Sequence, residues 1–438
     1  MSDGHGSDDE STKSSVTTAV NTAVEPNDSL LLFFIQTTPA LLLAGCNTLF
    51  SGWLYDRAEA SPFYDRIHEA FILTPPILGL KGNIEMTLVS RLSTFSHHTG
   101  FNKSWWEWLK SLAINLTLIW TQSFVLTLFA SVITLIMLVY RAHKDVDIYS
   151  YCIMLLSTAI TATTLASALL GTLMCFLVWL SVQINVDPDN VATPLSASTS
   201  DVVTLALFIY IGESQLKITE TPVYLVNLMP IVINILIVPF FAYVSYVHED
   251  TRPTLISGWG ILILAVMLNG VPKLFNLSSI TFWAVWKQSF NNVQSTQHQV
   301  QYDRWRATEA DSESFGRLCS PVTVYGCQDA DSKCGVLLIV CSVPLQVVFA
   351  VVLCLIYQDG STNFSLISVL VVSSLAQVTF LIFLSHCLVA LVARFNMDPD
   401  NCSIPVITSF ADLTGAGLLY LVFLIAGKLC PYALKHDH

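Results

Sequence analysis

Six apolar runs, each long enough to cross a bilayer, constrain this chain more than any other feature. A spanning helix needs about 20 apolar residues, and soluble domains rarely contain one such run. Only 12% of the 438 residues are charged, against about 25% in an average soluble domain. We therefore predict an all-α polytopic membrane protein. The runs lie at 30–54, 112–139, 150–182, 222–247, 334–357 and 364–393.

A polar motif occurs twice within this apolar chain. "NVDPDNVATPLSASTSD" at 185–201 and "NMDPDNCSIPVITSFAD" at 396–412 are identical at eight of seventeen positions. The shared residues include two aspartates, an asparagine, a proline and a final aspartate. Internal repetition at this distance predicts that the chain contains two similar structural units.

Weaker apolar segments complete each unit. They lie at 70–94, 254–272, 278–297 and 404–427, and a helix is expected from Pro194 to about 212. The order is then five elements, a linking helix at 222–247, and five more. Because the linking helix returns the chain to its starting side, the two units should be parallel, about a pseudo-twofold axis along the membrane normal. This predicts about 10–11 spans.

The predicted domain boundaries follow from this order. We expect a disordered acidic tail at 1–29, a first repeat at 30–213 and a linking segment at 214–252, followed by a second repeat at 253–427 and a C-terminal tail at 428–438. The first 29 residues resemble neither a signal peptide nor a transit peptide. A slight Lys/Arg bias favours a cytoplasmic N-terminus. We expect the plasma membrane as the location, with no nucleic-acid partner and an undetermined oligomeric state.

Asp201 and Asp412 are the main candidate ligands. Each follows a proline by seven residues within an apolar segment, about 10 Å along a helix. A carboxylate costs about 2.5–3.5 kcal/mol at the centre of a spanning helix on insertion scales. Two such groups converging on one axis predict a divalent cation between them. The alternative is that each aspartate caps a helix or bonds a neighbouring Ser or Thr.

The polar residues before these aspartates allow two interpretations. They can attract cations to the mouth of a path, since the net charge is −12 and no Lys or Arg lies within either motif. They are equally good turn formers. All offer hard oxygen atoms, which favour Mg²⁺ or Ca²⁺, and the sparse supply suits a hydrated Mg²⁺ ion. The residues are Asp187, Asp189, Asn190, Asp398, Asp400 and Asn401.

The segment "GLKGNIEMTLVSR" at 79–91 contains further candidates. Its glycines at 79 and 82 allow a broken helix whose carbonyls line a water-filled path, with Asn83 and Glu85 just inside the resumed helix. A simple glycine-containing loop is the alternative.

At these residues the chain resembles the animal solute carrier family 41, relatives of the bacterial MgtE-type magnesium transporters. The resemblance covers residues 30–427. It depends on "LGLKGNIEMTLVSRLST" (78–94), the two DPDN motifs, with the second extending to 415, and "SGW" (257–259). It implies two fused MgtE-like five-helix units, Mg²⁺ transport, and pore aspartates at Asp201 and Asp412, but not an enzyme.

The second half departs from the family pattern. Where the family has a second Gly-Gly-Asn segment, this chain has "SFNNVQSTQ", in which Asn292, Gln294 and Thr296 match Asn83, Glu85 and Thr87 at an offset of 209. The expected function is a channel or an exchanger with Na⁺ as a possible coupling ion. The alternative is a non-transporting regulatory or scaffold protein derived from the same family.

Overall fold

The computed structural model describes residues 26–99, 105–141, 148–184, 186–219, 224–274, 321–326, 330–357, 364–395 and 399–429. Every regular element in these ranges is helical, which confirms the all-α prediction. The first half contains α2 (Pro26–Glu59), α3 (Pro62–Arg66), α4 (Glu69–Thr99), α5 (Trp105–Arg141), α6 (Ile148–Gln183) and α7 (Pro188–Thr219). The linking segment is η1 (Tyr224–Leu228) with α8 (Met229–Val247).

The second half follows the linking segment. Its elements are α9 (Arg252–Ser257), α10 (Trp259–Leu274), α12 (Pro321–Tyr325), α13 (Ala330–Tyr357), α14 (Phe364–Arg394) and α15 (Pro399–Leu429). The expected span at 278–297 and its residues Asn292, Gln294 and Thr296 lie outside the described residues. The other ten expected elements are all present as helices in the described ranges.

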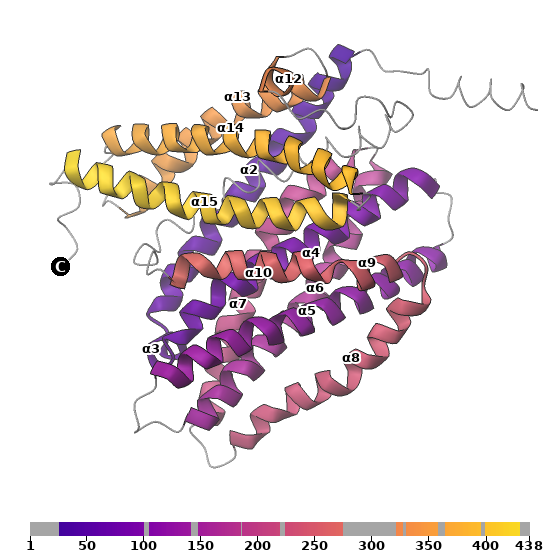
Figure 1. The fold of residues 1–438 in the computed structure, drawn as a ribbon, viewed down its shortest axis with the longest axis vertical. Helices are drawn as coiled ribbons and strands as arrows, with labels where there is room; N and C mark the ends of the chain where they lie inside the picture. The colour runs from indigo at the N-terminus through magenta and orange to yellow at the C-terminus, as the bar shows by residue number, and fades with distance from the viewer. Residues whose placement is uncertain are drawn as a thin grey trace, which may run out of the picture.

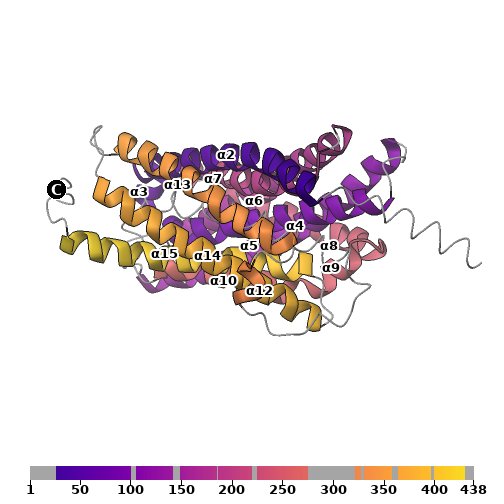
Figure 2. The same cartoon turned by 90° about the horizontal axis from the view of Figure 1, so that it is seen from above.

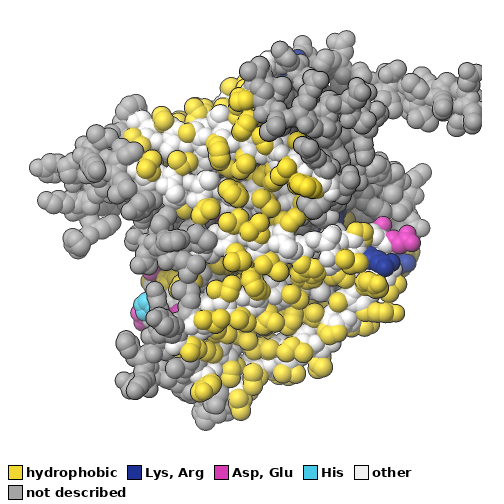
Figure 3. Space-filling model, viewed as in Figure 1, with side chains coloured by type: hydrophobic (Ala, Val, Ile, Leu, Met, Phe, Trp, Pro, Cys, Tyr) yellow, Lys and Arg dark blue, Asp and Glu magenta, His cyan; other side chains and the backbone are white. Residues whose placement is uncertain are grey.

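Six helices of the described part are long and apolar enough to cross a membrane. They are Leu109–Ile136, Tyr149–Gln183, Pro188–Thr219, Leu225–Val247, Gly335–Val352 and Ile367–Val392. Apolar side chains predominate among the described residues of the face shown in Figure 3, and their charged groups lie toward its edges. Helix α8 lies at the periphery (Figure 1) and exposes Leu236 and Phe240. An apolar surface of this extent is suited to lipid, so the chain is an integral, multi-pass membrane protein.

The two halves repeat one packing order. In the first half α7 packs against α2 and α6, and α5 packs against α6; in the second half α15 packs against α10 and α14, and α13 against α14. This repetition confirms the prediction of two similar units. The halves meet where α4 lies against α10 and α15 (Figures 1 and 2) and where α2 lies against α13.

Helix α4 corrects one prediction. It runs without a break from Glu69 to Thr99, so neither a broken helix nor a loop occurs at Gly79 and Gly82. Pro75 and Pro76 each remove one backbone donor, but the surrounding turns keep the helix continuous. The glycines allow close packing instead. A Cβ on Gly79 would lie 1.9 Å from Asn269 of α10, and one on Gly82 would touch the backbone of Ala197 of α7.

The starts of α7 and α15 correct a second prediction, that a helix begins at Pro194. Both helices begin within the DPDN motifs, at Pro188 and Pro399, so Pro194 and Pro405 are interior and not first residues. The Asp187 carboxylate accepts a hydrogen bond from the backbone N–H of Asp189 at 3.1 Å. An N-cap aspartate followed by proline at the first helical position is a strong helix start, and it outweighs the interior proline.

Candidate cation path

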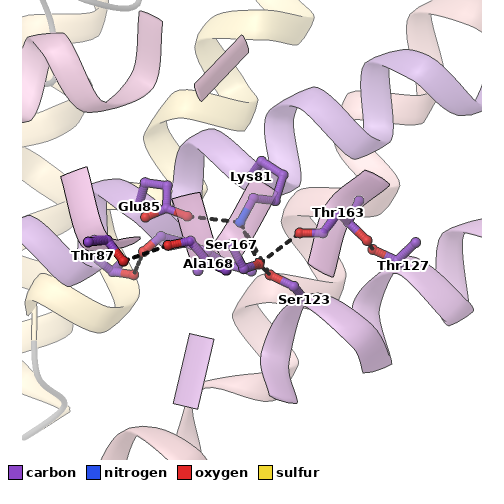
Figure 4. Close-up of polar contacts among 10 residues, drawn as sticks. Lys81, Glu85, Thr87, Ser123, Thr127, Thr163, Ser167 and Ala168 are labelled. Atoms are coloured by element: carbon purple, nitrogen blue, oxygen red, sulfur yellow. Dashed lines mark hydrogen bonds and ion pairs between the residues drawn. The ribbon is translucent and has the colours of Figure 1, made fainter. Parts of the chain in front are cut away.

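Helix α4 carries an ion pair that is fully buried between α5 and α6. Lys81 Nζ lies 2.8 Å from Glu85 Oε1, and both side chains are 0% exposed. The ammonium also donates to Ser167 Oγ at 2.8 Å and to Ser123 Oγ at 3.4 Å (Figure 4). Residues four apart lie on the same face of a helix, which places the two charges side by side. Lys81 therefore has a compensating charge within its own helix.

Hydroxyl groups extend this network between α5 and α6. Ser167 donates to Ser123 Oγ at 2.7 Å, and Thr127 donates to Thr163 Oγ1 at 3.0 Å. A buried pair is tolerated only when further hydrogen bonds compensate for its desolvation. The serines supply two of them to Lys81. Glu85 Oε2 has no hydrogen-bond partner among the described residues.

Asn83 faces a different direction from Glu85. Two residues apart on a helix turn by about 200°, so the structure does not bring these two predicted ligands together. Asn83 Oδ1 accepts a hydrogen bond from Thr408 Oγ1 at 2.5 Å, and Asn83 Nδ2 donates to Ser409 Oγ at 3.4 Å. Asn83 therefore joins α4 of the first half to α15 of the second.

Asp201 and Asp412 lie one turn beyond the residues that flank this part of α4. Asp201 follows Ala197, which lies opposite Gly82, and Asp412 follows Thr408, which bonds Asn83. Gly82 and Asn83 differ by about 100° around α4. Helices α7 and α15 therefore adjoin neighbouring faces of α4, and we call the region between these two faces the corner of α4, α7 and α15.

The environments of the two aspartates differ. Asp201 is 3% exposed, whereas Asp412 is only partly buried. Because α7 starts at Pro188, Asp201 lies about 20 Å along the helix rather than the predicted 10 Å.

The residues before Asp201 are divided between capping and helix packing. Asp187 caps α7, which supports the turn-forming interpretation for this residue, and Asp189 lies in the first turn, 1% exposed, where a carboxylate interacts favourably with the helix dipole. Asn190 Nδ2 donates to Gln36 Oε1 of α2 at 2.9 Å. These residues are separated from Asp201 by about three turns and do not form one cluster with it.

The corresponding residues of the second half are only partly described. Asn401 is 7% exposed in the first turns of α15, and Asp400 lies beside it in the helix. Asp398 falls outside the described residues.

The described residues contain no group of three or more His, Cys, Asp or Glu side chains that could hold a metal ion. A cation at the corner of α4, α7 and α15 would depend on the two aspartates, neutral oxygens and its own water. That composition suits an ion that keeps part of its hydration shell.

Sequence reasoning missed three contributors to this region. The Lys81–Glu85 pair could have been found from its spacing of four residues within an apolar helix. Asn269 of α10 and the Thr408–Ser409 pair carry no comparable signal, because their proximity to α4 depends on how the two halves pack.

A comparison against protein families agrees with the repeated order of helices. A family model described as "MgtE: Divalent cation transporter" matches residues 74–211 and 331–422, which together make up more than half of the chain. The chain belongs to the MgtE family of divalent cation transporters. Its two matched segments contain the regions that carry Asp201 and Asp412, and the family is one of transporters, not enzymes.

Individual relatives match nearly the whole length of this MgtE-family chain. Solute carrier family 41 member 3 of Mus musculus is 28% identical over 91% of this chain and 83% of its own length. Member 2 of Mus musculus is 29% identical over 91% of this chain and 71% of its own length, and member 2 of Homo sapiens is 28% identical with the same coverage. No solved structure matches.

The second matched segment of the MgtE model begins only at residue 331. The stretch with "SFNNVQSTQ" therefore lies outside the match, whereas α4 in the first half lies almost entirely within it.

Proposed function

We propose that this MgtE-family chain moves Mg²⁺ through a path at the corner of α4, α7 and α15, with Asp201 and Asp412 as its main ligands. One observation carries the proposal. The turn at Gly82–Asn83 packs against Ala197 of α7 and Thr408 of α15, which are equivalent positions in the two halves. The two aspartates follow these positions at the same spacing and so come from opposite halves to one region.

The donor set favours Mg²⁺ over softer metals. Two carboxylates and neutral oxygens are hard ligands, and Mg²⁺ gives up its water reluctantly. Asn83 Oδ1 accepts one hydrogen bond, from Thr408, and keeps a second lone pair that can face an ion. Glu85 holds Lys81 through Oε1, and its negative charge is already balanced by that ammonium. We place Asp187, Asp189, Asn190, Asp398, Asp400 and Asn401 near the mouth of the path, where carboxylates raise the local cation concentration.

Coupling and location are part of the same proposal. Movement of Mg²⁺ is either channel-like or coupled to Na⁺, and the N-terminus lies in the cytoplasm of a cell whose plasma membrane holds the protein. Flux measured with and without a Na⁺ gradient separates the two modes of transport.

The test is Mg²⁺ uptake into proteoliposomes containing a Mg²⁺-sensitive dye. Asp201→Asn and Asp412→Asn should each reduce uptake by at least about tenfold, because each removes one charge from a site with few ligands. Asp250→Asn is the matched control, since Asp250 is exposed in the turn after α8. Normal flux in the double variant would refute the assignment of these ligands. Absence of flux in the native protein would favour the regulatory or scaffold alternative.

A further inference from the structure

The amide of Asn269 lies at the contact between α10 and α4, where the two halves meet, and it is buried without a hydrogen bond among the described residues. Asn269 is 1% exposed on α10, and neither Oδ1 nor Nδ2 has a hydrogen-bond partner among the described residues. Leaving one buried polar group without a partner costs about 1–3 kcal/mol in proteins. An amide with two such atoms inside a membrane bundle therefore needs an explanation.

Gly79 provides the space that this amide occupies. A Cβ at Gly79 would lie 1.9 Å from Asn269 Nδ2 and 2.7 Å from Cγ, so any other residue at position 79 would displace the side chain. One residue further along α10, a Cβ on Gly270 would lie 3.6 Å from Pro76 of α4. Close packing on both sides of the amide holds it against the face of α4 that also carries Asn83.

The level of Asn269 in the membrane follows from three helices. Gly79 lies one turn before Asn83 on the same face of α4, and Asp412 lies one turn after Thr408 on the same face of α15. Because Asn83 bonds Thr408 and the two helices run in opposite directions, Asp412 comes level with Gly79. Asn269 contacts Gly79 and therefore belongs to the same layer.

Packing supports this layer. Helix α10 lies against both α4 and α15, and α10 and α15 run in the same direction across Figure 1, from the side of α9 toward the C-terminus. The layer also includes Asp201. Ala197 of α7 contacts Gly82 of α4, and Asp201, one turn after Ala197, therefore lies level with the residues one turn before Gly82.

We propose that Asn269 is a third polar ligand of the cation path, acting with Asp201 and Asp412 on a hydrated divalent cation. Its Oδ1 accepts a hydrogen bond from a water molecule of the ion, or binds the ion directly, and its Nδ2 donates to water or to a carboxylate of the same layer. This inference depends on the proposed function, because it assigns a further residue to the same path.

Asn47 provides a comparison, because it is an asparagine with a structural role in the first helix of the first half. Asn47 of α2 donates to Thr199 Oγ1 of α7 at 3.0 Å, and α2 takes the place in the first half that α10 takes in the second. Asn47 therefore uses its amide to connect two helices. The amide of Asn269 makes no such hydrogen bond within the described residues, so it remains available for an ion and its water.

The variant Asn269→Leu tests whether Asn269 is a ligand of the ion or only a packing residue. If the amide only fills space, leucine removes two unsatisfied polar atoms with the same branching and number of side-chain heavy atoms, and leaves transport unchanged. If the amide binds the hydrated ion, thermal stability without Mg²⁺ is retained or increased, whereas Mg²⁺ uptake falls about tenfold, the loss expected when a hydrogen bond to a charged group disappears. The stabilisation of the purified protein by Mg²⁺ weakens as well.

Asn234→Leu is the matched control. Asn234 of α8 is 6% exposed and accepts a hydrogen bond from Trp120 Nε1 at 3.0 Å, far from the path. This variant should lose stability and keep its response to Mg²⁺. As a second variant, Asn269→Asp keeps the shape and adds a charge, so it should bind Mg²⁺ more tightly in the melting assay.

Each outcome bears on the proposal. Native-like uptake and a native-like melting shift in Asn269→Leu would overturn it, and so would an Asn269→Asp variant with no change in Mg²⁺ affinity. Failure of the proposed function is distinguishable, because the native protein itself would then show neither Mg²⁺ uptake nor stabilisation by Mg²⁺.

Discussion

Replacing Lys81 by methionine should be strongly destabilising, although the new side chain is apolar and lies in a membrane protein. Lys81 and Glu85 are 0% exposed and lie 2.8 Å apart. Removing the ammonium leaves the Glu85 carboxylate buried without its counter-ion, and Ser123 and Ser167 lose the group that they bind. Breaking a buried pair from one side typically costs about 3–5 kcal/mol.

The double variant Lys81→Met with Glu85→Met provides the decisive comparison. Replacing both members of a buried pair by apolar residues of similar volume is often neutral or stabilising. We therefore expect the double variant to be more stable than Lys81→Met alone by at least about 2 kcal/mol, a factor of about 30 in the unfolding equilibrium.

The free energy of unfolding can be measured in mixed micelles by tryptophan fluorescence. Lys110→Met is the control, because Lys110 is exposed near the start of α5 and should change stability by less than about 0.5 kcal/mol. Two results would contradict the reasoning: a Lys81→Met variant no less stable than this control, or a double variant as unstable as the single one.

Two further predictions concern helix packing and helix initiation. Gly45→Ala should destabilise the contact between α2 and α13 by about 1–3 kcal/mol, because its Cβ would lie 2.0 Å from the Phe349 ring; thermal melting should show partial recovery when Phe349→Leu is added, and no recovery would mean that the strain lies elsewhere. Asp187→Ala should cost about 1 kcal/mol through loss of the N-cap of α7, whereas Asp187→Asn should cost much less; equal losses in melting temperature would show that charge rather than capping matters.

The membrane class, the repeat and the approximate positions of the helices could be predicted from the sequence. Long apolar runs leave few alternatives, because every backbone polar group inside a bilayer has to be paired within a helix. The identity of the two DPDN motifs predicted that α7 and α15 would be equivalent, and both helices start at the same proline of the motif. The sequence also singled out Asp201 and Asp412, because placing a carboxylate in an apolar membrane helix costs free energy wherever the helix lies in the fold.

The predicted details of α4 were wrong for a physical reason. Two prolines and two glycines within eight residues suggested a break, since each residue weakens a helix locally. In the folded protein Gly79 packs tightly against Asn269 of α10 and Gly82 touches the backbone of α7, and packing of α4 in the bundle compensates for the poor helix propensity of glycine. Propensity is a local property, and the neighbours that outweigh it are distant in the sequence.

The sequence by itself determined that this chain spans a membrane, that it is built twice from one pattern, and that each half contributes one aspartate within an apolar helix. Only the tertiary structure decided which polar residues meet. It placed Ser123 and Ser167 around the Lys81 ammonium, joined Asn83 to Thr408, and packed Asn269 against Gly79. Contacts of this kind depend on the angle between helices and on side chains separated by up to 326 positions, which no local pattern records.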